Sequence, residues 1–277
     1  MTVEDLLVEG KSSIHSDHAK ILLAELLNLN PLEMLLHLDD KVENDTITKY
    51  RNEVRALLNG KPLQYVMGYT NFYGNKFIVN ESVLIPRFET EELVENLINY
   101  INKYFKESID IIDLGTGSGA IGITLKKKIP LSNVDLLDIS KDALEVAKKN
   151  ADNMNAEVNL IEGDMLESVD KKYDVIVSNP PYIKTGEEIE KIVEKNEPHL
   201  ALYAGEDGLL FYKKILKKIN KNLKDKFIVA FEIGSDEKEN VINLINKYMK
   251  DVTIIPKKDM SEKDRMIFII SNNLINE

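Results

Sequence analysis

The chain has no cysteine and only four histidines among its 277 residues. Without cysteine, neither disulfide bonds nor metal sites built from thiolates are possible. His15, His18 and His37 lie in the first part of the chain without the spacing of metal ligands, so we expect no bound metal. Neither His199 nor any lysine stands in a pattern typical of a catalytic base. Chemistry that depends on a metal or a histidine base is therefore not expected.

Long apolar runs and excess positive charge are also missing. No segment approaches the ~18 apolar residues needed to span a bilayer, and residues 1–5 lack the apolar region of a secretory signal. The formal net charge of −11 disfavours a protein that grips duplex nucleic acid mainly through its phosphates. These features predict a cytoplasmic protein with no membrane and no direct nucleic-acid partner.

Residues 1–70 show only helical patterns. Thr2, with Asp5 three residues later, can cap a first helix. Asn30-Pro31 is typical of a helix start, and we expect a helix over residues 32–38. Further helices are expected at residues 19–27 and 45–58. A small helical bundle more often recognises a partner or stabilises its neighbour than carries out chemistry, and we predict a substrate-recognition domain here.

Residues 71–88 change character. Aromatic and β-branched residues around Gly74-Asn75 predict a β-hairpin. The segment Leu84-Ile85-Pro86-Arg87 and a helix of about residues 89–105 follow. We therefore assign 71–88 to a β-hairpin linker and 89–277 to a second domain.

From Asp110 onward, strands and helices alternate, which is typical of an α/β fold with a doubly wound parallel sheet. Seven strands are expected, at residues 110–114, 134–138, 158–161, 173–177, 227–232, 252–255 and 266–270. Helices are expected at residues 120–127, 141–150, 209–223 and 236–249, the second of them capped by Ser140. The last two strands are close enough in sequence to pair as an antiparallel hairpin, so the predicted sheet is mostly parallel.

A glycine turn joins the first of these strands to the first helix. Gly115, Gly117 and Gly119 lack side chains, which lets a ligand approach the backbone. The spacing from Gly115 to Ala120, with Asp138 at the end of the next strand, also satisfies the relaxed dinucleotide fingerprint. Taken alone, this turn supports an NAD-dependent oxidoreductase nearly as well as a methyltransferase.

Carboxylates around the turn favour a cationic ligand. Asp113 lies just before it, where a carboxylate can meet a cationic amino-acid end but would face a pyrophosphate badly. Asp138 is expected to accept from ribose 2′ and 3′ hydroxyls, and Asp164 to lie near an adenine amine. These groups suit S-adenosylmethionine. The predicted cofactor-binding residues are Asp113, Gly115, Thr116, Gly117, Gly119, Asp138, Asp164 and Asn179.

The segment Asn179-Pro180-Pro181-Tyr182 directly follows the fourth strand. Its prolines end that strand and make a rigid loop at the carboxyl edge, where open α/β sheets bind ligands. Asn179 offers a side-chain carbonyl, Pro180 a backbone carbonyl and Tyr182 an aromatic face. Two acceptors beside an aromatic face suit a planar NH2 group on a carboxamide or an aminopurine.

Together, Asp113 to Gly119 and Asn179 to Tyr182 resemble the class I (Rossmann-like) methyltransferases that modify planar nitrogens. More closely, the chain is similar to the HemK/PrmC family of peptide chain release factor N5-glutamine methyltransferases. Other segments that carry this resemblance are Pro62-Leu63-Gln64-Tyr65, Leu84-Ile85-Pro86-Arg87, Thr90-Glu91-Glu92-Leu93-Val94, Glu197-Pro198, Ala201-Leu202 and Asp264-Arg265. Phe88-Glu89 departs from the family, which usually has proline followed by an acidic residue.

The resemblance implies methyl transfer from S-adenosylmethionine to the side-chain amide nitrogen of a glutamine, in the Gly-Gly-Gln motif of class 1 release factors. Acceptors at Asn179 and Pro180 would fix that nitrogen and stabilise the positive charge that develops on it. The expected catalytic residues are Asn179, Pro180 and Tyr182, and the expected substrate-binding residues are Asn179, Pro180, Pro181, Tyr182, Arg87 and Glu197.

Four other functions compete with this one. A glutamine methyltransferase acting on a ribosomal protein would share every catalytic residue. An adenine-N6 methyltransferase of nucleic acid uses the same tetrapeptide, but the net charge and the lack of a basic, aromatic recognition domain count against it. An NAD-dependent oxidoreductase shares the glycine signal. A non-enzymatic binding module would leave two ligand loops without a task.

Overall fold

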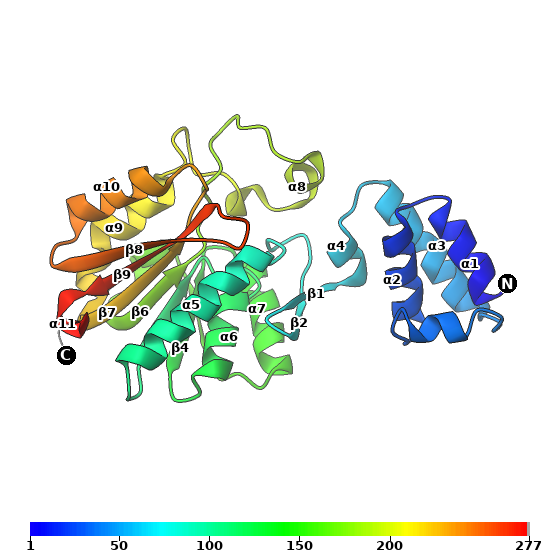
Figure 1. The fold of residues 1–277 in the computed structure, drawn as a ribbon, viewed down its shortest axis with the longest axis horizontal. Coiled ribbons are helices and arrows are strands. Elements are labelled where there is room, and N and C mark those ends of the chain that lie inside the picture. Colours follow the sequence, from blue (N-terminus) through cyan, green and yellow to red (C-terminus); the bar gives the residue numbers. More distant parts are fainter. Residues whose placement is uncertain (276–277) are drawn as a thin grey trace. The chain divides into compact units, whose positions relative to one another are not determined.

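The computed structural model describes residues 1–275, which divide into two compact units (Figure 1). The first unit comprises Met1–Gly68 together with Lys191–Asn196, and the second comprises Tyr69–Glu190 and the chain from Glu197 onward. No helix among the described residues is long and apolar enough to cross a membrane.

The first unit is helical. Its elements are α1 (Val3–Lys11), α2 (Ser16–Leu26), η1 (Glu33–Leu36), α3 (Asn44–Leu58), α4 (Leu63–Met67) and α8 (Lys191–Asn196). Thr2 and Asp5 form the predicted capping box at the start of α1. Leucine side chains of α1 and α2 pack with Met34 and Tyr50 in a core that water does not reach. Asn196 donates to the carbonyl oxygen of Gly60 at 2.9 Å, which ties α8 into this unit.

Two local predictions for this unit are corrected. Residues 32–38 form only a single 3₁₀ turn, η1, although Asn30 Oδ1 accepts from the N–H groups of Leu32 and Glu33 as a cap should. Forming one helical turn orders several backbone dihedrals but gains few hydrogen bonds. A segment as short as this one therefore gains little by forming an α-helix. The sequence reading also missed α4 and α8, which have five and six residues and too short a stretch for a helical period to show.

The second unit begins with the predicted hairpin of β1 (Tyr69–Phe72) and β2 (Asn75–Ile78). Its turn residues are Tyr73 and Gly74, one position earlier than expected. Both have positive φ, 49° and 75°, as a two-residue hairpin turn requires. Phe72 and Phe77 are buried in the core of this unit, so the hairpin packs as part of it.

Seven strands form one sheet in the order β5-β4-β3-β6-β7-β9-β8. They are β3 (Asp110–Leu114), β4 (Asn133–Asp138), β5 (Asn159–Glu162), β6 (Tyr173–Ser178), β7 (Leu223–Glu232), β8 (Val252–Lys258) and β9 (Asp264–Ser271). The first five run parallel, and β9 runs antiparallel to both β7 and β8. This confirms the predicted mostly parallel sheet. The strand order reverses between β3 and β6, which is the topological switch point.

Helices cover both faces of the sheet (Figure 1). On one face lie α5 (Phe88–Tyr104), α6 (Ala120–Lys128) and α7 (Lys141–Asn153), and on the other lie η2 (Met165–Ser168), α9 (Leu210–Asn222) and α10 (Lys238–Tyr248). The short η3 (His199–Ala201) and α11 (Asn272–Ile275) complete the unit. Ser140 caps α7 as predicted. Ile111 packs on the first face and Ile112 on the second, so both alternating positions are apolar and the strands read as continuous apolar runs.

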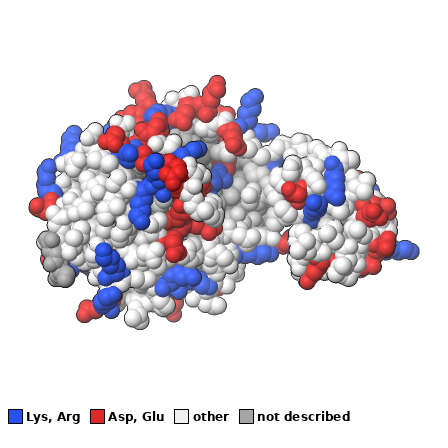
Figure 2. All heavy atoms as spheres, viewed as in Figure 1, with Lys and Arg blue, Asp and Glu red and all other residues white. Residues whose placement is uncertain are grey.

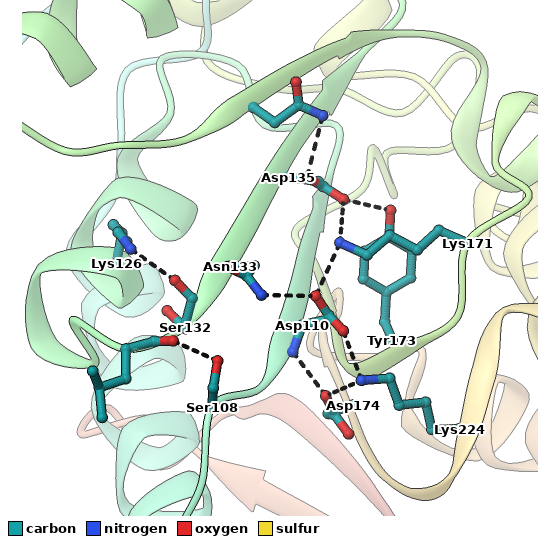
Figure 3. A network of polar contacts seen from close by, with 12 residues as sticks. Ser108, Asp110, Lys126, Ser132, Asn133, Asp135, Lys171, Tyr173, Asp174 and Lys224 are labelled. Carbon is teal, nitrogen blue, oxygen red and sulfur yellow. Dashed lines mark hydrogen bonds and ion pairs between the residues drawn. The ribbon is translucent and has the colours of Figure 1, made fainter.

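A network of ion pairs closes the amino ends of the strands (Figure 3). Lys171 Nζ lies 3.0 Å from Asp110 and 3.2 Å from Asp135, and Lys224 Nζ lies 2.6 Å from Asp110 and 2.8 Å from Asp174. Lys224 belongs to β7, which starts at Leu223 rather than at the predicted Phe227 because its first residues pair beside Tyr173 and reach these carboxylates. Each of the three carboxylates at this edge thus has a lysine partner.

Candidate active site

The glycine turn after β3 is held in conformations that favour glycine. Gly117 has φ +54°, and no atom lies within 4 Å of the place where a Cβ would stand. Gly119 is the N-cap of α6 with φ +83°, and a Cβ there would lie 2.6 Å from Ile123 Cδ1. Gly119 is therefore required by both backbone and packing, whereas Gly117 leaves open space in which a ligand can approach the backbone.

A cavity of about 260 Å³ lies at the carboxyl edge of the parallel strands, beside this turn. Of the residues predicted for the site, those that line the cavity are Gly115, Gly117, Asp138, Asp164, Asn179 and Pro181. Apolar side chains supply much of the remaining wall, and among them are Leu84, Ile139, Met165, Leu200 and Phe211. A shallower hollow of about 740 Å³ lies at the amino ends of β4 and β5, away from the edge where parallel sheets bind ligands.

Asp138 ends β4 and faces the glycine turn. Its side chain is buried; Oδ2 accepts from Gly117 N at 2.8 Å and Oδ1 accepts from Ser140 N at 2.9 Å. Burial raises the pKa of Asp138, and the backbone donors oppose that rise. Each carboxylate oxygen has a second lone-pair direction, so the group can still accept from hydroxyls of a ligand.

Asp113, the residue before Leu114 in β3, fixes the glycine turn through hydrogen bonds. It is fully buried, and its Oδ2 accepts from Thr116 Oγ1 at 2.6 Å and from Gly122 N at 2.9 Å. Burial raises the pKa of Asp113 to about 6. Its Oδ1 has no hydrogen-bond partner among residues 1–275. Asp113, Thr116 and Gly119 do not line the cavity, so their contact with a cofactor stays a prediction.

Asp164 lines the far side of the cavity with a partner that sequence reasoning missed. Lys214 Nζ, on α9, lies 2.5 Å from Asp164 Oδ2, and both side chains are partly exposed. Met165 follows with φ +50°, a strained backbone for a non-glycine residue, and its side chain is buried at the cavity wall. The positive charge of Lys214 thus compensates the negative charge of Asp164 at this wall of the cavity.

Asn179 lies at the carboxyl end of β6, where its strand is clamped by a bond from Ser178 Oγ to Leu114 O at 2.7 Å. Asn179 Nδ2 donates to Thr90 Oγ1 at 3.2 Å, and Thr90 Oγ1 in turn donates to Glu232 Oε2 at 2.7 Å. Tyr182 is half-buried, and burial raises its pKa to about 12. Asn179 and Pro181 line the cavity, whereas Pro180 and Tyr182 do not.

Arg87 and Glu197 meet each other. Arg87 Nη2 lies 2.5 Å from Glu197 Oε1, and Glu197 Oε2 accepts from Ile85 N at 3.2 Å. Glu197 is buried, whereas the Arg87 side chain is 36% exposed. The pair joins two segments that supply cavity residues, one before Ile85 and one after Glu197.

The sequence analysis assigned no site role to Thr90, Glu232 or Lys214, nor to the apolar wall of the cavity. Ile139 carried a usable signal, because it is a large apolar residue between a strand-ending Asp138 and the cap of α7, outside either period. Among the described residues, no group of three or more His, Cys, Asp or Glu side chains is arranged to hold a metal ion.

The chain matches two family models, the Methyltransferase small domain over residues 90–227 and the PrmC N-terminal domain over residues 3–68. It is 38% identical over 255 residues to the release factor glutamine methyltransferase of Bacillus cereus, covering 90% of each chain. It is 40% identical over 256 residues to the enzyme of the same name from Bacillus subtilis, covering 90% of this chain and 89% of that one. The chain belongs to the family of release factor glutamine methyltransferases. This confirms the resemblance noted in the sequence.

Among solved structures, the fold of this family member is similar to that of a methyltransferase from Pyrococcus furiosus, with a TM-score of 0.53. The match covers 80% of this chain and 98% of that one at 18% identity. At this identity the likeness concerns the fold, which is that of the methyltransferase domain.

Proposed function

We propose that this protein transfers the methyl group of S-adenosylmethionine to the side-chain amide nitrogen (N5) of the glutamine in the Gly-Gly-Gln motif of class 1 peptide chain release factors. Membership of the family supports this substrate. Because such factors act in translation, we place the reaction in the cytoplasm. In S-adenosylmethionine the methyl group is bonded to a positively charged sulfur. The methyl carbon is therefore electrophilic without help from a metal.

The cavity at the carboxyl edge fits this cofactor. It combines a long apolar wall with carboxylates at Asp138 and Asp164, and open backbone at Gly117. We assign Asp138 to the ribose hydroxyls, since a buried carboxylate with free lone pairs binds a pair of hydroxyls well. Asp164 and the apolar wall would hold the adenine. Asp113, with one oxygen unpartnered in the described chain, would favour a positive charge near the turn.

The observation that carries the proposal is the position of Asn179. It lines the same cavity as Asp138 and the glycine turn, with its amide NH2 bonded to Thr90. Its carbonyl oxygen is thus left to accept from the NH2 of a glutamine. An amide nitrogen is a poor nucleophile, so holding it in line and stabilising its developing positive charge are the two tasks of the site.

The other predicted residues support this role. The Pro180 carbonyl would supply the second acceptor, and Pro181 and Tyr182 would keep the loop rigid beside the glutamine. The Arg87 guanidinium, which is partly exposed, would face the substrate chain while Glu197 holds it in place. We assign substrate recognition to the helical unit that matches the PrmC N-terminal domain.

The test is methylation of a purified class 1 release factor with methyl-labelled S-adenosylmethionine, followed by mass spectrometry of the peptide that contains Gly-Gly-Gln. We expect one methyl group on the motif glutamine and none on a factor whose motif glutamine is replaced by asparagine. Ribosomal proteins and duplex DNA are tested in parallel. Basic and acidic side chains are intermixed on the face shown in Figure 2, which gives phosphates no continuous positive surface there. Labelling of a ribosomal protein or of adenine, with none on the release factor, contradicts the proposal.

A further inference from the structure

Three segments that are far apart in the sequence meet at Asn179. Thr90 lies in the first turn of α5, Asn179 follows β6, and Glu232 ends β7. Thr90 is 4% exposed and Glu232 is 2% exposed, and the two hydrogen bonds Asn179–Thr90–Glu232 measure 3.2 and 2.7 Å. A buried polar chain of this kind is fully specified only if every donor finds an acceptor.

The donor-to-acceptor direction of these two hydrogen bonds follows from the number of protons available. An ionised Glu232 can only accept, so the single hydroxyl proton of Thr90 points to it. Thr90 Oγ1 can then only accept from Asn179, which requires the Asn179 NH2 group on that side. The Asn179 carbonyl oxygen is thereby directed away from Thr90. With the amide turned over, its NH2 would meet the NH2 of the substrate glutamine, donor against donor.

We propose that Thr90 and Glu232 are positioning residues for methyl transfer, which fix the Asn179 amide with its carbonyl oxygen toward the acceptor nitrogen. This inference rests on the proposed function and adds to it two buried residues that do not line the cavity. Donation from the Asn179 NH2 also polarises the amide, which strengthens its carbonyl as an acceptor.

The protonation of Glu232 controls this orientation. Burial raises the pKa of Glu232 to about 7, against the hydrogen bond from Thr90 and the positive charge of Arg265. The charged or titratable groups around it are Arg265 on β9, Glu89 on α5, Tyr182 after the β6 loop and Tyr212 on α9. A protonated Glu232 can donate to Thr90 Oγ1, which frees the threonine proton and allows the Asn179 amide to rotate by 180°. The rate of methyl transfer should therefore rise with pH as Glu232 ionises.

The first test compares Thr90→Val, which keeps the shape but removes the hydroxyl, with Thr90→Ser, which keeps the hydroxyl. Single-turnover methyl transfer should fall about 10- to 100-fold in Thr90→Val, the scale for a misplaced reacting group, and recover in Thr90→Ser. The affinity for S-adenosylhomocysteine should stay within about 2-fold in both, because the cofactor carboxylates are unchanged. Wild-type activity on the release factor is measured first, so that a wrong substrate is recognised before any variant is judged.

The second test needs no activity and works on the full-length protein alone. The ¹³C shift of the Glu232 carboxyl should titrate near neutral pH, and the ¹⁵N shift of the Asn179 side-chain amide should follow the same curve. Glu232→Gln should abolish that titration at Asn179 and flatten the pH dependence of turnover. If Thr90→Val does not fold, this titration in the wild type still decides. An Asn179 amide that ignores pH, or a Thr90→Val enzyme with wild-type turnover, overturns the proposal.

Discussion

Asp138 Oδ2 accepts a hydrogen bond from the backbone N–H of Gly117 at 2.8 Å, across the gap between two neighbouring strand ends. The bond joins β4 to the turn that follows β3, so one carboxylate both shapes the glycine turn and faces the cavity. Removing it changes the turn and the ligand contact together.

Asp138→Ala should weaken S-adenosylhomocysteine binding by about 1–3 kcal/mol, the range for losing hydrogen bonds to a buried charged group. Calorimetry measures this directly. Glu162→Ala is the matched control, since Glu162 pairs with Asp138 in register, is exposed and lies outside the cavity lining. Equal losses in the two variants would mean that net charge, rather than a contact at Asp138, governs binding.

Asn179→Ala should lower the rate of methyl transfer by roughly 10²-fold or more while cofactor affinity holds, because it removes one positioned acceptor. Asn179→Asp keeps an acceptor and should retain more activity than the alanine variant. Single-turnover kinetics and a melting curve are recorded for each. Joint loss of stability and cofactor binding, with activity per folded molecule unchanged, would show that Asn179 serves only the fold.

Asp113→Asn should change how stability depends on pH. The folded-state pKa of Asp113, about 6, lies above its ordinary value of 3.8, so the native state binds the extra proton between these values. Asp113 therefore contributes stability that is fully present below pH 3.8 and is lost as pH rises through about 6. The loss amounts to at most about 3 kcal/mol. Urea unfolding at several pH values should show this loss in the wild type and not in Asp113→Asn. Parallel curves for the two proteins would contradict it.

A fragment that begins at Tyr69 should keep cofactor binding and lose most activity on an intact release factor. The start is placed before β1 because Phe72 and Phe77 belong to the core of the second unit. A short peptide containing Gly-Gly-Gln is the control substrate, which the fragment should methylate as well as the full chain does. Cooperative melting and cofactor affinity confirm that the fragment folds. If the fragment methylated the intact factor as fast as the full chain does, the helical unit would not be the part that recognises the release factor.

The sheet could be predicted because most of its strands are short apolar runs that are recognisable locally, and several of them end beside Gly, Asp or Pro. It also named residues that the structure gathers around one cavity, since Gly117, Asp138 and Asn179 all follow parallel strands and such ends share one edge. Their roles stay predictions until tested.

What sequence reasoning missed depends on distance along the chain. Thr90 and Glu232 stand 142 positions apart, and each looks alone like an ordinary helix-start or strand-end residue. Arg87 and Glu197 are separated by 110 positions, and both were expected to face a substrate rather than each other. Pairings of this kind arise from the tertiary fold, which no local sequence pattern encodes.

The chain of Thr90, Asn179 and Glu232 also bears on when the protein becomes competent during its own synthesis. The glycine turn and Asp138 lie in the first half of the chain, but the acceptor amide is oriented only once β7 has joined the sheet, at residue 232 of 277. Because domains generally fold as units, the cavity and the oriented amide should form together, once β7 has emerged from the ribosome. A nascent chain of this protein should therefore be inactive in methyl transfer until β7 has joined the sheet.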